Sequence, residues 1–454
     1  MERKVAIIGA GISGLLACKY TLSKGFTPVV FESRSSIGGV WRKTLETTKL
    51  QTPKPFYQFS DFPWPSSVKE EFPNQFQLFD YLQSYARHFD LLRHIKFNSK
   101  VVSIEYEGAS DEEMQAWELW GGNGEPFSSK GKWNLTVTDT QILSTEVYQV
   151  DFVILCIGRF TDVPNIPEFP PQNSSKGNEQ LWLVSRNMHW TYRWSVQQAN
   201  AMGVPLAYLY FSRFSELLVH KPGEGFFLSL LATILSPVRW GFSKWVESHI
   251  KKKLSLEKFG MVPKHSFLKE ISACLISTVP EGFYDRVEKG SIILKKAPKF
   301  SFCEQGIVVD GEITPIETDL VILATGFKGE KKLKDIFVSP AFQDCILGSP
   351  NCIVPFYSGN WILGEYFKPV HIGDECRWLA ELLDSTFKLP SIKEMEKDAA
   401  RWDKYMKQSS GEYYRRSCIG ALHIWYNDQL CKDMGWNPKR KKGFFAELLS
   451  LCPK

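Results

Sequence analysis

The sequence predicts an α/β protein with a discontinuous dinucleotide-binding domain of the Rossmann type and a second domain inserted into it. Three observations lead to this prediction: three spaced glycines that follow a short N-terminal strand, a carboxylate at the end of the next strand, and two similar apolar strands far apart in the chain. A chain of 454 residues is long enough for two or three domains with cores of their own.

The first element is an apolar strand at residues 5–8, followed by a Gly-x-Gly-x-x-Gly turn. Gly9 allows the tight turn, Gly11 allows a pyrophosphate to approach the backbone closely, and Gly14 allows the following helix to pack against the strand. The run 15–22 predicts that helix. Because the free N–H groups and the dipole of a helix N-terminus attract anions, we expect the pyrophosphate of a dinucleotide there.

The second strand, at residues 28–31, ends on Glu32. A carboxylate about 20 residues beyond the glycine turn is placed to accept hydrogen bonds from a ribose hydroxyl. A strand–helix–strand unit without a ligand is the alternative, and the full motif argues against it. The sequence has no second copy of the motif, because the glycines at 121–124 follow no apolar strand. One site predicts one bound dinucleotide.

The residues after Glu32 indicate which dinucleotide this is. Gly38 and Gly39 let the backbone pass close to a bulky cofactor, and Trp41 can form a wall beside an extended planar ring. The pattern Glu-x-Arg-x-x-x-Gly-Gly-x-Trp from Glu32 to Trp41 resembles the FAD site of the flavin-containing monooxygenases. The resemblance extends over residues 4–163 and from about 204 to the C-terminus, and it is strongest to the plant members.

Two similar segments predict where the chain crosses between domains. Residues 151–158 and 319–326 share five of eight positions, and each reads as a buried parallel strand that ends in glycine. Chance similarity of two core strands is the alternative. With the resemblance, they divide the chain into a first part of the FAD domain (1–165), a truncated NADPH and substrate domain (166–318), and a second part of the FAD domain with C-terminal helices (319–454).

The resemblance implies a defined reaction. NADPH reduces FAD, O2 adds to form a C4a-hydroperoxyflavin, and oxygen passes to the nitrogen or sulfur of a small amine or sulfide, as in N,N-dimethylaniline monooxygenases. Because the flavin carries this chemistry, no side-chain nucleophile and no metal is required. The sequence agrees, since its ten cysteines are scattered and form no cluster with histidine.

The resemblance also implies site residues. Two residues, Gln51 and Thr52, are candidates for the place where the family often has an asparagine near the flavin, although Gln51 is better explained as a loop residue. Arg186 is the candidate for the 2′-phosphate of NADPH. Val102, Thr325 and Gly326 are further candidates for contacts with FAD. Val102 could equally be an ordinary strand residue, and Thr325 and Gly326 could equally form a hinge between the domains. The FAD-binding residues implied are Gly9, Gly11, Gly14, Glu32, Gly38, Gly39, Val40, Trp41, Val102, Thr325 and Gly326.

Two stretches are shorter than the family pattern. After Pro170 a polar loop leads directly to the run ending near Arg186, so that roughly one strand–helix–strand unit with the second glycine motif is missing. A second passage is shortened after Ser358. These positions suggest a splice form or a gene model that skips exons. The alternative function is therefore a protein that binds FAD but holds NADPH poorly and is catalytically impaired.

Charge and hydropathy limit the other partners. The net charge is only +5, and no basic run is interleaved with aromatics, so nucleic-acid binding is not expected. The N-terminus enters a strand at once, which leaves no room for a signal peptide, and a cytoplasmic location is expected.

The most apolar stretch, residues 226–235, is too short to span a membrane. We expect a buried helix or a lid over an apolar substrate there. The tryptophans and lysines that follow leave open a peripheral contact with a membrane such as the endoplasmic reticulum.

Overall fold

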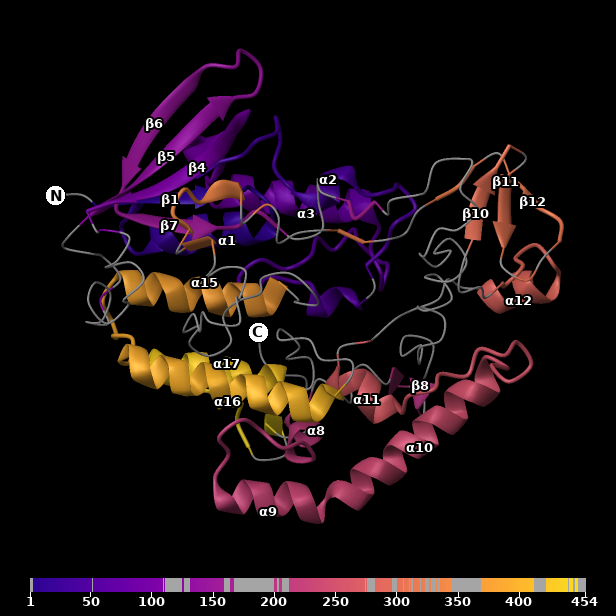
Figure 1. Cartoon of the computed structure of the whole chain (residues 1–454). Coiled ribbons are helices and arrows are strands. Elements are labelled where there is room, and N and C mark those ends of the chain that lie inside the picture. Colours follow the sequence, from indigo (N-terminus) through magenta and orange to yellow (C-terminus); the bar gives the residue numbers. More distant parts are fainter. Residues whose placement is uncertain are drawn as a thin grey trace.

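The computed structural model describes residues 3–50, 52–108, 131–158, 212–273, 282–295, 369–411 and 422–439, together with short pieces between these ranges. Figure 1 shows the N-terminal strands and helices stacked above a layer of C-terminal helices, with a long bent helix pair along the lower edge. A small antiparallel sheet lies at the end of the molecule farthest from the N-terminus (Figure 1). This sheet consists of β10 (Phe300–Cys303), β11 (Gly306–Val309) and β12 (Ile316–Glu317).

The N-terminal strand–helix–strand unit forms as the sequence predicts. Strand β1 (Lys4–Ile8) leads into helix α1 (Ile12–Ser23), and β2 (Thr27–Phe31) returns parallel to β1. On the other side of β1 lies β7 (Phe152–Leu155), also parallel, with Ile8 opposite Leu155. The sheet order β3-β2-β1-β7, with β3 at Ile95–Lys96, places the first crossing strand beside the glycine turn.

A second, antiparallel sheet covers one side of this unit. It consists of β4 (Ser99–Glu107), β5 (Lys132–Asp139) and β6 (Thr145–Val150). A distant piece of the chain joins it, because Phe337 forms a parallel bridge with Ile104 and Val338 N donates to Ile104 O at 3.0 Å. Ile336, Phe337 and Phe342 are buried against this sheet. Residues beyond 319 therefore return to the N-terminal region, while the exact domain boundaries stay a prediction.

The expected second crossing strand is not borne out over its described residues. Residues 320–322 form no strand, and the exposed fractions of Leu320 and Ile322 are 71% and 63%. An apolar segment forms a buried strand only if another strand pairs with it. In the described sheet β7 is the edge strand, and residues 320–322 do not pair with it. The two crossing segments do meet, since Asn165 N donates to Gly326 O at 2.8 Å and Pro164 bridges Phe327.

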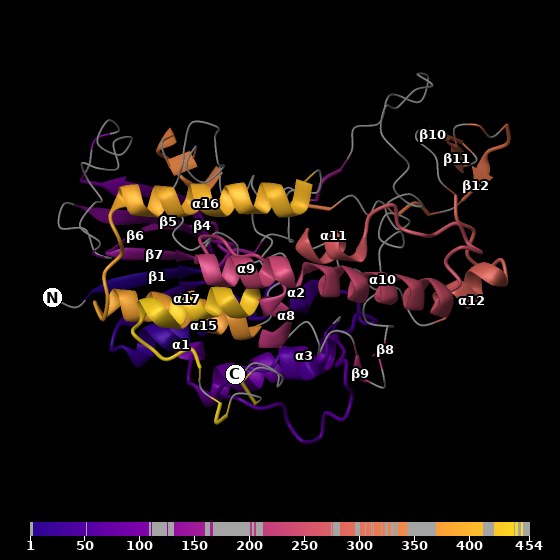
Figure 2. The ribbon, with the colours of Figure 1, turned by 90° about the horizontal axis from the view of Figure 1, so that it is seen from below.

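Helix α15 (Pro369–Leu383) joins the C-terminal part of the chain to α1. Lys24 forms ion pairs with Glu381 at 2.7 Å and with Asp384 at 3.1 Å. Arg377 Nη2 donates to the hydroxyl of Tyr20 at 2.8 Å. Two further helices, α16 (Ile392–Ser410) and α17 (His423–Asp433), complete this layer, which Figure 2 shows from below.

A half-buried carboxyl in this layer should make stability depend on pH. Tyr426 donates to Glu375 at 3.0 Å, and burial raises the pKa of Glu375 from 4.5 to about 8. Between about pH 5 and 8 the folded chain keeps a proton that the unfolded chain has lost, so stability falls as pH rises and levels off above 8. We expect the melting temperature of Glu375→Gln, relative to the original chain, to rise across this window in a thermal melt. Glu105→Gln, at an exposed position of β4, should show no such trend.

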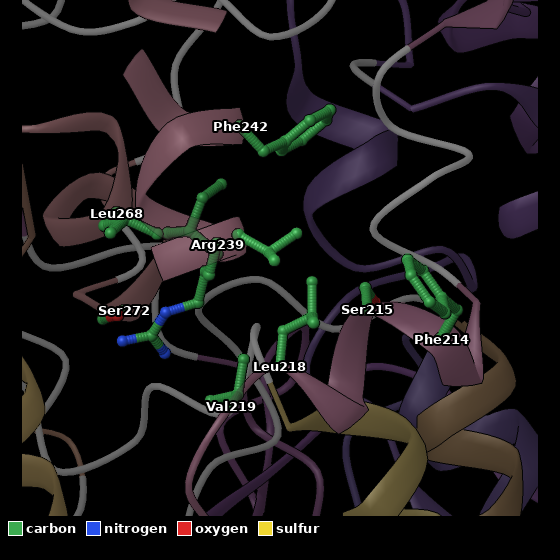
Figure 3. A pocket seen from close by; sticks show the side chains of 10 residues that line it. Phe214, Ser215, Leu218, Val219, Arg239, Phe242, Leu268 and Ser272 are labelled. Carbon is green, nitrogen blue, oxygen red and sulfur yellow. The ribbon is translucent and has the colours of Figure 1, made fainter. Parts of the chain in front are cut away.

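A group of helices between these parts surrounds a cavity. Helices α8 (Arg213–Leu217), α10 (Ser236–Lys253) and α11 (Phe267–Ser272) line a mostly apolar, partly open cavity of about 160 Å³ (Figure 3). Its lining residues come from these helices and from Leu218 and Val219, just beyond α8.

The apolar stretch at 226–235 forms helix α9 (Phe226–Ile234), but this helix is not buried as expected. The exposed fractions of the Phe226 and Phe227 side chains are 74% and 83%, and only Ala232 in the helix is buried. The composition is that of a core helix, yet no described element covers its outer face. Within the described residues no single helix could cross a membrane. Helices α9 and α10 meet at a bend of 45°, and only together do they have the length and apolar composition of a broken membrane span.

The remaining described elements are short or connect the parts above. Helix α3 is fixed at its start by a capping box between Asn74 and Gln77. These elements are α2 (Val40–Lys43), η1 (Lys54–Phe56), α3 (Gln75–His88), η2 (Leu92–His94), β8 (Asn200–Ala201), β9 (Val204–Pro205) and α12 (Phe283–Glu288).

Candidate flavin site

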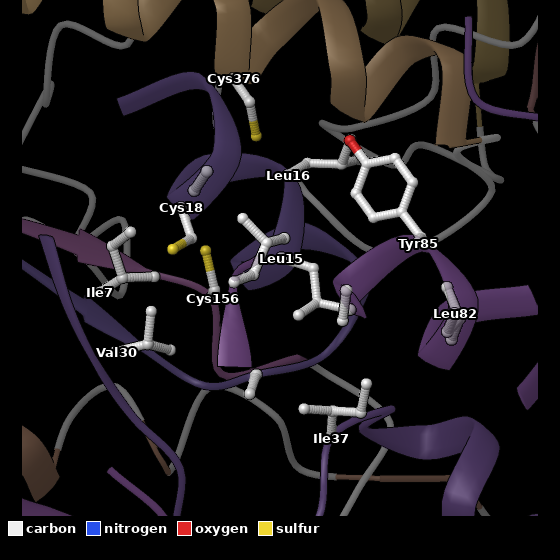
Figure 4. Packing of buried hydrophobic residues seen from close by; sticks show 14 of the residues in the cluster. Ile7, Leu15, Leu16, Cys18, Val30, Ile37, Leu82, Tyr85, Cys156 and Cys376 are labelled. Carbon is white, nitrogen blue, oxygen red and sulfur yellow. The ribbon is translucent and has the colours of Figure 1, made fainter. Parts of the chain in front are cut away.

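The glycine turn is held by close backbone contacts that only glycine permits. Gly9 has φ +103°, and its N–H donates to Phe31 O at 2.8 Å. A Cβ at Gly9 would lie 2.5 Å from the carbonyl oxygen of Cys156, and one at Gly14 would lie 1.8 Å from that of Gly9. Figure 4 shows the core around this turn, where side chains of Ile7, Leu15 and Cys156 converge (Figure 4). The turn is therefore fixed in place by β1, α1 and β7.

The N-terminus of α1 is free to bind an anion. Gly11, which has no side chain to cap the helix, is the N-cap, and no acidic residue lies in the first turn. The first N–H groups of a helix have no acceptor within the helix. These donors and the helix dipole make this end of α1 suitable for a pyrophosphate.

The second glycine pair lies directly against the first motif. Gly38 N donates to Ala10 O at 3.0 Å, and Gly39 has φ +56°. A Cβ on Gly39 would lie 3.2 Å from the Cα of Gly11, and a Cβ on Gly11 would lie 3.7 Å from the Cα of Gly39. Two stretches of backbone without side chains thus face each other beside the N-terminus of α1. We call the two facing glycines, Gly11 and Gly39, the glycine cradle.

Glu32 lies at the end of β2 and is almost fully buried. Its Oε2 accepts from Ala10 N at 2.8 Å, and its Oε1 accepts from Arg34 N at 3.0 Å. These bonds hold the carboxylate beside the glycine turn, where a ribose next to the pyrophosphate would lie. Arg34 Nη1 also donates to Gly39 O at 3.3 Å, a contact that joins the two motifs.

Trp41 lies in α2, immediately after the cradle. Its Nε1 donates to the hydroxyl of Tyr57 at 3.0 Å, the two rings meet edge to face at 5.8 Å, and Gln75 Nε2 donates to its carbonyl at 2.9 Å. Burial raises the pKa of Tyr57, so its phenol stays neutral. Val40, next to Trp41, is 45% exposed.

The other expected residues are more scattered. Val102 is skipped in the pairing of β4 with β5, because the register shifts between Val101 and Ser103. Its strand begins close to Glu32, since Ser99 N donates to Glu32 O at 2.8 Å. Thr52 is half-buried in the segment before η1, and Gly326 lies at the meeting of the crossing segments. Three expected residues lie outside the described part: Gln51, Arg186 and Thr325.

The residues that are described fit an adenine dinucleotide. The site offers free N–H donors, a cradle that a Cβ would fill, and a fixed carboxylate. Arg34, Tyr57 and Gln75 were not predicted as site residues from the sequence. Arg34 was visible as the arginine of the quoted pattern, whereas Tyr57 and Gln75 reach Trp41 only through folding. Within the described residues, no group of His, Cys, Asp and Glu could hold a metal ion.

Comparisons with known proteins identify the family of this chain. The family model described as flavin-binding monooxygenase-like matches residues 2–189, which include the whole glycine cradle. The "Probable flavin-containing monooxygenase 1" of Arabidopsis thaliana is 34% identical, over 98% of this chain and 94% of that protein. The chain belongs to the flavin-containing monooxygenase family. By family it is an oxidoreductase that uses NADPH and O2.

More distant members and solved structures extend the comparison. This monooxygenase is 23% identical to "Dimethylaniline monooxygenase [N-oxide-forming] 2" of Oryctolagus cuniculus, over 96% of this chain and 84% of that protein. A cyclohexanone monooxygenase from Rhodococcus sp. Phi1, solved with NADP+, has a TM-score of 0.62 at 16% identity, over 94% and 97% of the two chains. The S-allyl-L-cysteine S-oxygenase of Allium sativum has a TM-score of 0.52 at 17% identity, over 96% and 89%. These likenesses support the two-dinucleotide-binding α/β fold.

The alignment with the first Arabidopsis relative also contains a gap. It runs over 512 positions, yet 98% of the 454 residues fill only about 445 of them. Roughly 67 positions (512 less 445) therefore have no counterpart in this monooxygenase. This agrees with the shortened stretches noted in the sequence.

Proposed function

We propose that this chain is an FAD- and NADPH-dependent monooxygenase that transfers oxygen to the nitrogen or sulfur of a small molecule. The observation that carries the proposal is the glycine cradle, where Gly11 and Gly39 face each other beside the free N-terminus of α1. One relative is named for forming N-oxides and one solved neighbour for S-oxygenation, which supports these two substrate classes.

Each residue of the site has a physical task. The N–H groups at the start of α1 bind the pyrophosphate, and the glycines leave room for it. Glu32, held by Ala10 N, accepts from a ribose hydroxyl. Trp41, fixed by Tyr57 and Gln75, keeps water from one side of the cofactor. The bound flavin supplies the activation of O2, and the protein supplies position and exclusion of water.

Reduction by NADPH tests the whole proposal. The chain is purified with FAD, NADPH is added without O2, and loss of the flavin colour is followed over time. Air and N,N-dimethylaniline or S-allyl-L-cysteine are then added, and oxygenated product is measured against hydrogen peroxide. A competent enzyme should lose its flavin colour quickly, and it should form about one molecule of oxygenated product for each molecule of NADPH consumed. Absence of bleaching at any NADPH concentration contradicts it.

A second candidate function rests on the missing positions. If the roughly 67 absent alignment positions include the NADPH glycine motif, the chain binds FAD but holds NADP+ poorly. Reduction would then be slow, and O2 would be reduced to hydrogen peroxide instead of being transferred to a substrate. Fast bleaching at micromolar NADPH would rule out this candidate. Restoring the absent segment from the Arabidopsis relative should speed reduction only if the candidate is right.

We further propose that the enzyme rests on a membrane surface through α9 and α10, rather than remaining free in the cytoplasm. Helix α9 carries no charge, and six of its nine residues are exposed and apolar. Helix α10 adds exposed Trp240 and Trp245, and it ends in Lys251, Lys252 and Lys253. An uncharged helix beside tryptophans and lysines is typical of an interfacial helix on anionic lipid.

Vesicle flotation tests this surface. We expect the chain to float with vesicles that contain an anionic lipid, and Phe226→Ser with Phe227→Ser to reduce the floating fraction at least about tenfold, since two buried phenylalanines contribute roughly 1.5–3 kcal/mol each. Ile142→Ser with Leu143→Ser, equally exposed on the β5–β6 turn, is the control and should float normally. Equal flotation of all three proteins contradicts the proposal. A dimer that dissociates in the phenylalanine variant would instead assign α9 to a second copy.

A further inference from the structure

The cavity between α8, α10 and α11 lies outside the flavin site and has an unusual composition. Its walls are apolar apart from two serines and one cation, Arg239. Figure 3 shows the Arg239 guanidinium pointing toward the side where Ser272 and Val219 lie, away from the rings of Phe214 and Phe242 (Figure 3). The cavity thus has one charged end and one aromatic end.

The charged end has an unmet hydrogen-bonding group. The Nε of Arg239 is enclosed by the protein and has no hydrogen-bond partner in the part of the chain that the structure describes, so a ligand can reach this guanidinium only at its two terminal nitrogens. Leaving a buried, charged donor without a partner is costly. Tyr405 lies within electrostatic reach of Arg239, but burial raises the pKa of its phenol. Tyr405 therefore stays neutral and supplies no counter-charge.

Neither serine is a hydrogen-bond partner of Arg239 Nε. Ser215 Oγ already donates to Ser212 O at 2.8 Å. A carboxylate is the acceptor whose geometry matches a guanidinium, because it can accept two parallel N–H bonds. As the one cation among the lining residues, Arg239 therefore favours an anion as the ligand.

The apolar end sets the size of the ligand. An engineered apolar cavity of about 150 Å³ holds a benzene molecule, and the cavity here measures about 160 Å³. Phe214 and Phe242 offer ring surfaces, and Leu218 and Ile271 complete the wall. The space fits one ring or a chain of similar volume.

From this geometry we infer that the cavity binds a small apolar carboxylate, with the carboxylate on Arg239 and the apolar body between Phe214 and Phe242. This site is separate from the proposed flavin chemistry. It joins α8, which contacts α17, to α10 and α11. A bound carboxylate would therefore hold these helices together.

Benzoate and its neutral analogue benzamide test the inference by isothermal titration calorimetry on the full chain. We expect benzoate to bind at least about tenfold more tightly than benzamide, because only benzoate pairs with the guanidinium. Arg239→Gln should remove this ratio. Arg286→Gln, an exposed arginine on α12, is the matched control and should keep it. Leu268→Trp fills the cavity and should weaken both ligands.

Equal binding of benzoate and benzamide by the original chain overturns the inference, as does an unchanged ratio in Arg239→Gln or no binding at all. If Arg239→Gln does not fold, Leu268→Trp decides: benzoate binding that survives a filled cavity also overturns it. The FAD content of each protein is measured alongside. Benzoate binding by protein without FAD supports this site while the proposed function fails, so the two outcomes remain distinguishable.

Discussion

Gly11→Ala should yield folded protein that has lost its flavin. The backbone at Gly11 has φ −74°, which alanine adopts readily, and the nearest atom to a new Cβ is the Cα of Gly39 at 3.7 Å, an ordinary contact. The methyl group instead occupies the glycine cradle, where the pyrophosphate must approach the backbone. We expect FAD affinity to fall at least about tenfold, or about 1.4 kcal/mol, measured by quenching of FAD fluorescence.

The matched control for this prediction is Gly241→Ala in α10. A Cβ there meets nothing within 4 Å, and alanine in a helix interior is favoured over glycine by roughly 0.5–1 kcal/mol. This variant should keep its FAD and melt slightly higher than the original chain. Circular dichroism should give matching folded spectra for both variants. If Gly11→Ala retains FAD at the original affinity, the pyrophosphate does not lie in the cradle.

Gly14→Ala should fail in a different way, by loss of the fold. A Cβ at this position would lie 1.8 Å from the carbonyl oxygen of Gly9, which is backbone and cannot rotate away. Helix α1 must then shift from β1 and disturb the core around Leu15 and Cys156. We expect destabilisation of about 3 kcal/mol or more, measured by denaturant unfolding.

Comparing the two glycine variants separates binding from folding within one motif. Added FAD should raise the melting temperature of neither variant. Gly11→Ala cannot bind the cofactor, and in Gly14→Ala helix α1 cannot pack against the turn. If Gly14→Ala unfolds at the same denaturant concentration as the original chain, α1 does not pack against the glycine turn as described.

The local parts of the fold were predictable from the sequence. The strand, turn and helix around Gly9 depend on backbone conformations that the nearby residues themselves determine, and they form where the sequence places them. Glu32 likewise lies at the end of its strand, beside the turn. Short-range patterns are sufficient where each local preference agrees with the fold.

The parts that were wrong depend on distant partners. Leu320 and Ile322 have the composition of a buried strand, but no described strand pairs with them. Helix α9 reads as a core helix, yet Phe227 is exposed because nothing described packs on its outer face. The contact between Gly11 and Gly39, and the link from Trp41 to Tyr57, also arise only through folding.

The flavin content of the purified chain tests the central claim most directly. The protein is incubated with FAD, freed of unbound cofactor by gel filtration, and its visible absorbance is compared with its protein concentration. We predict one FAD per chain for the original protein and for Gly241→Ala, and almost none for Gly11→Ala. A colourless original protein, or a Gly11→Ala variant that stays fully yellow, would contradict the assignment of the glycine cradle as the flavin site.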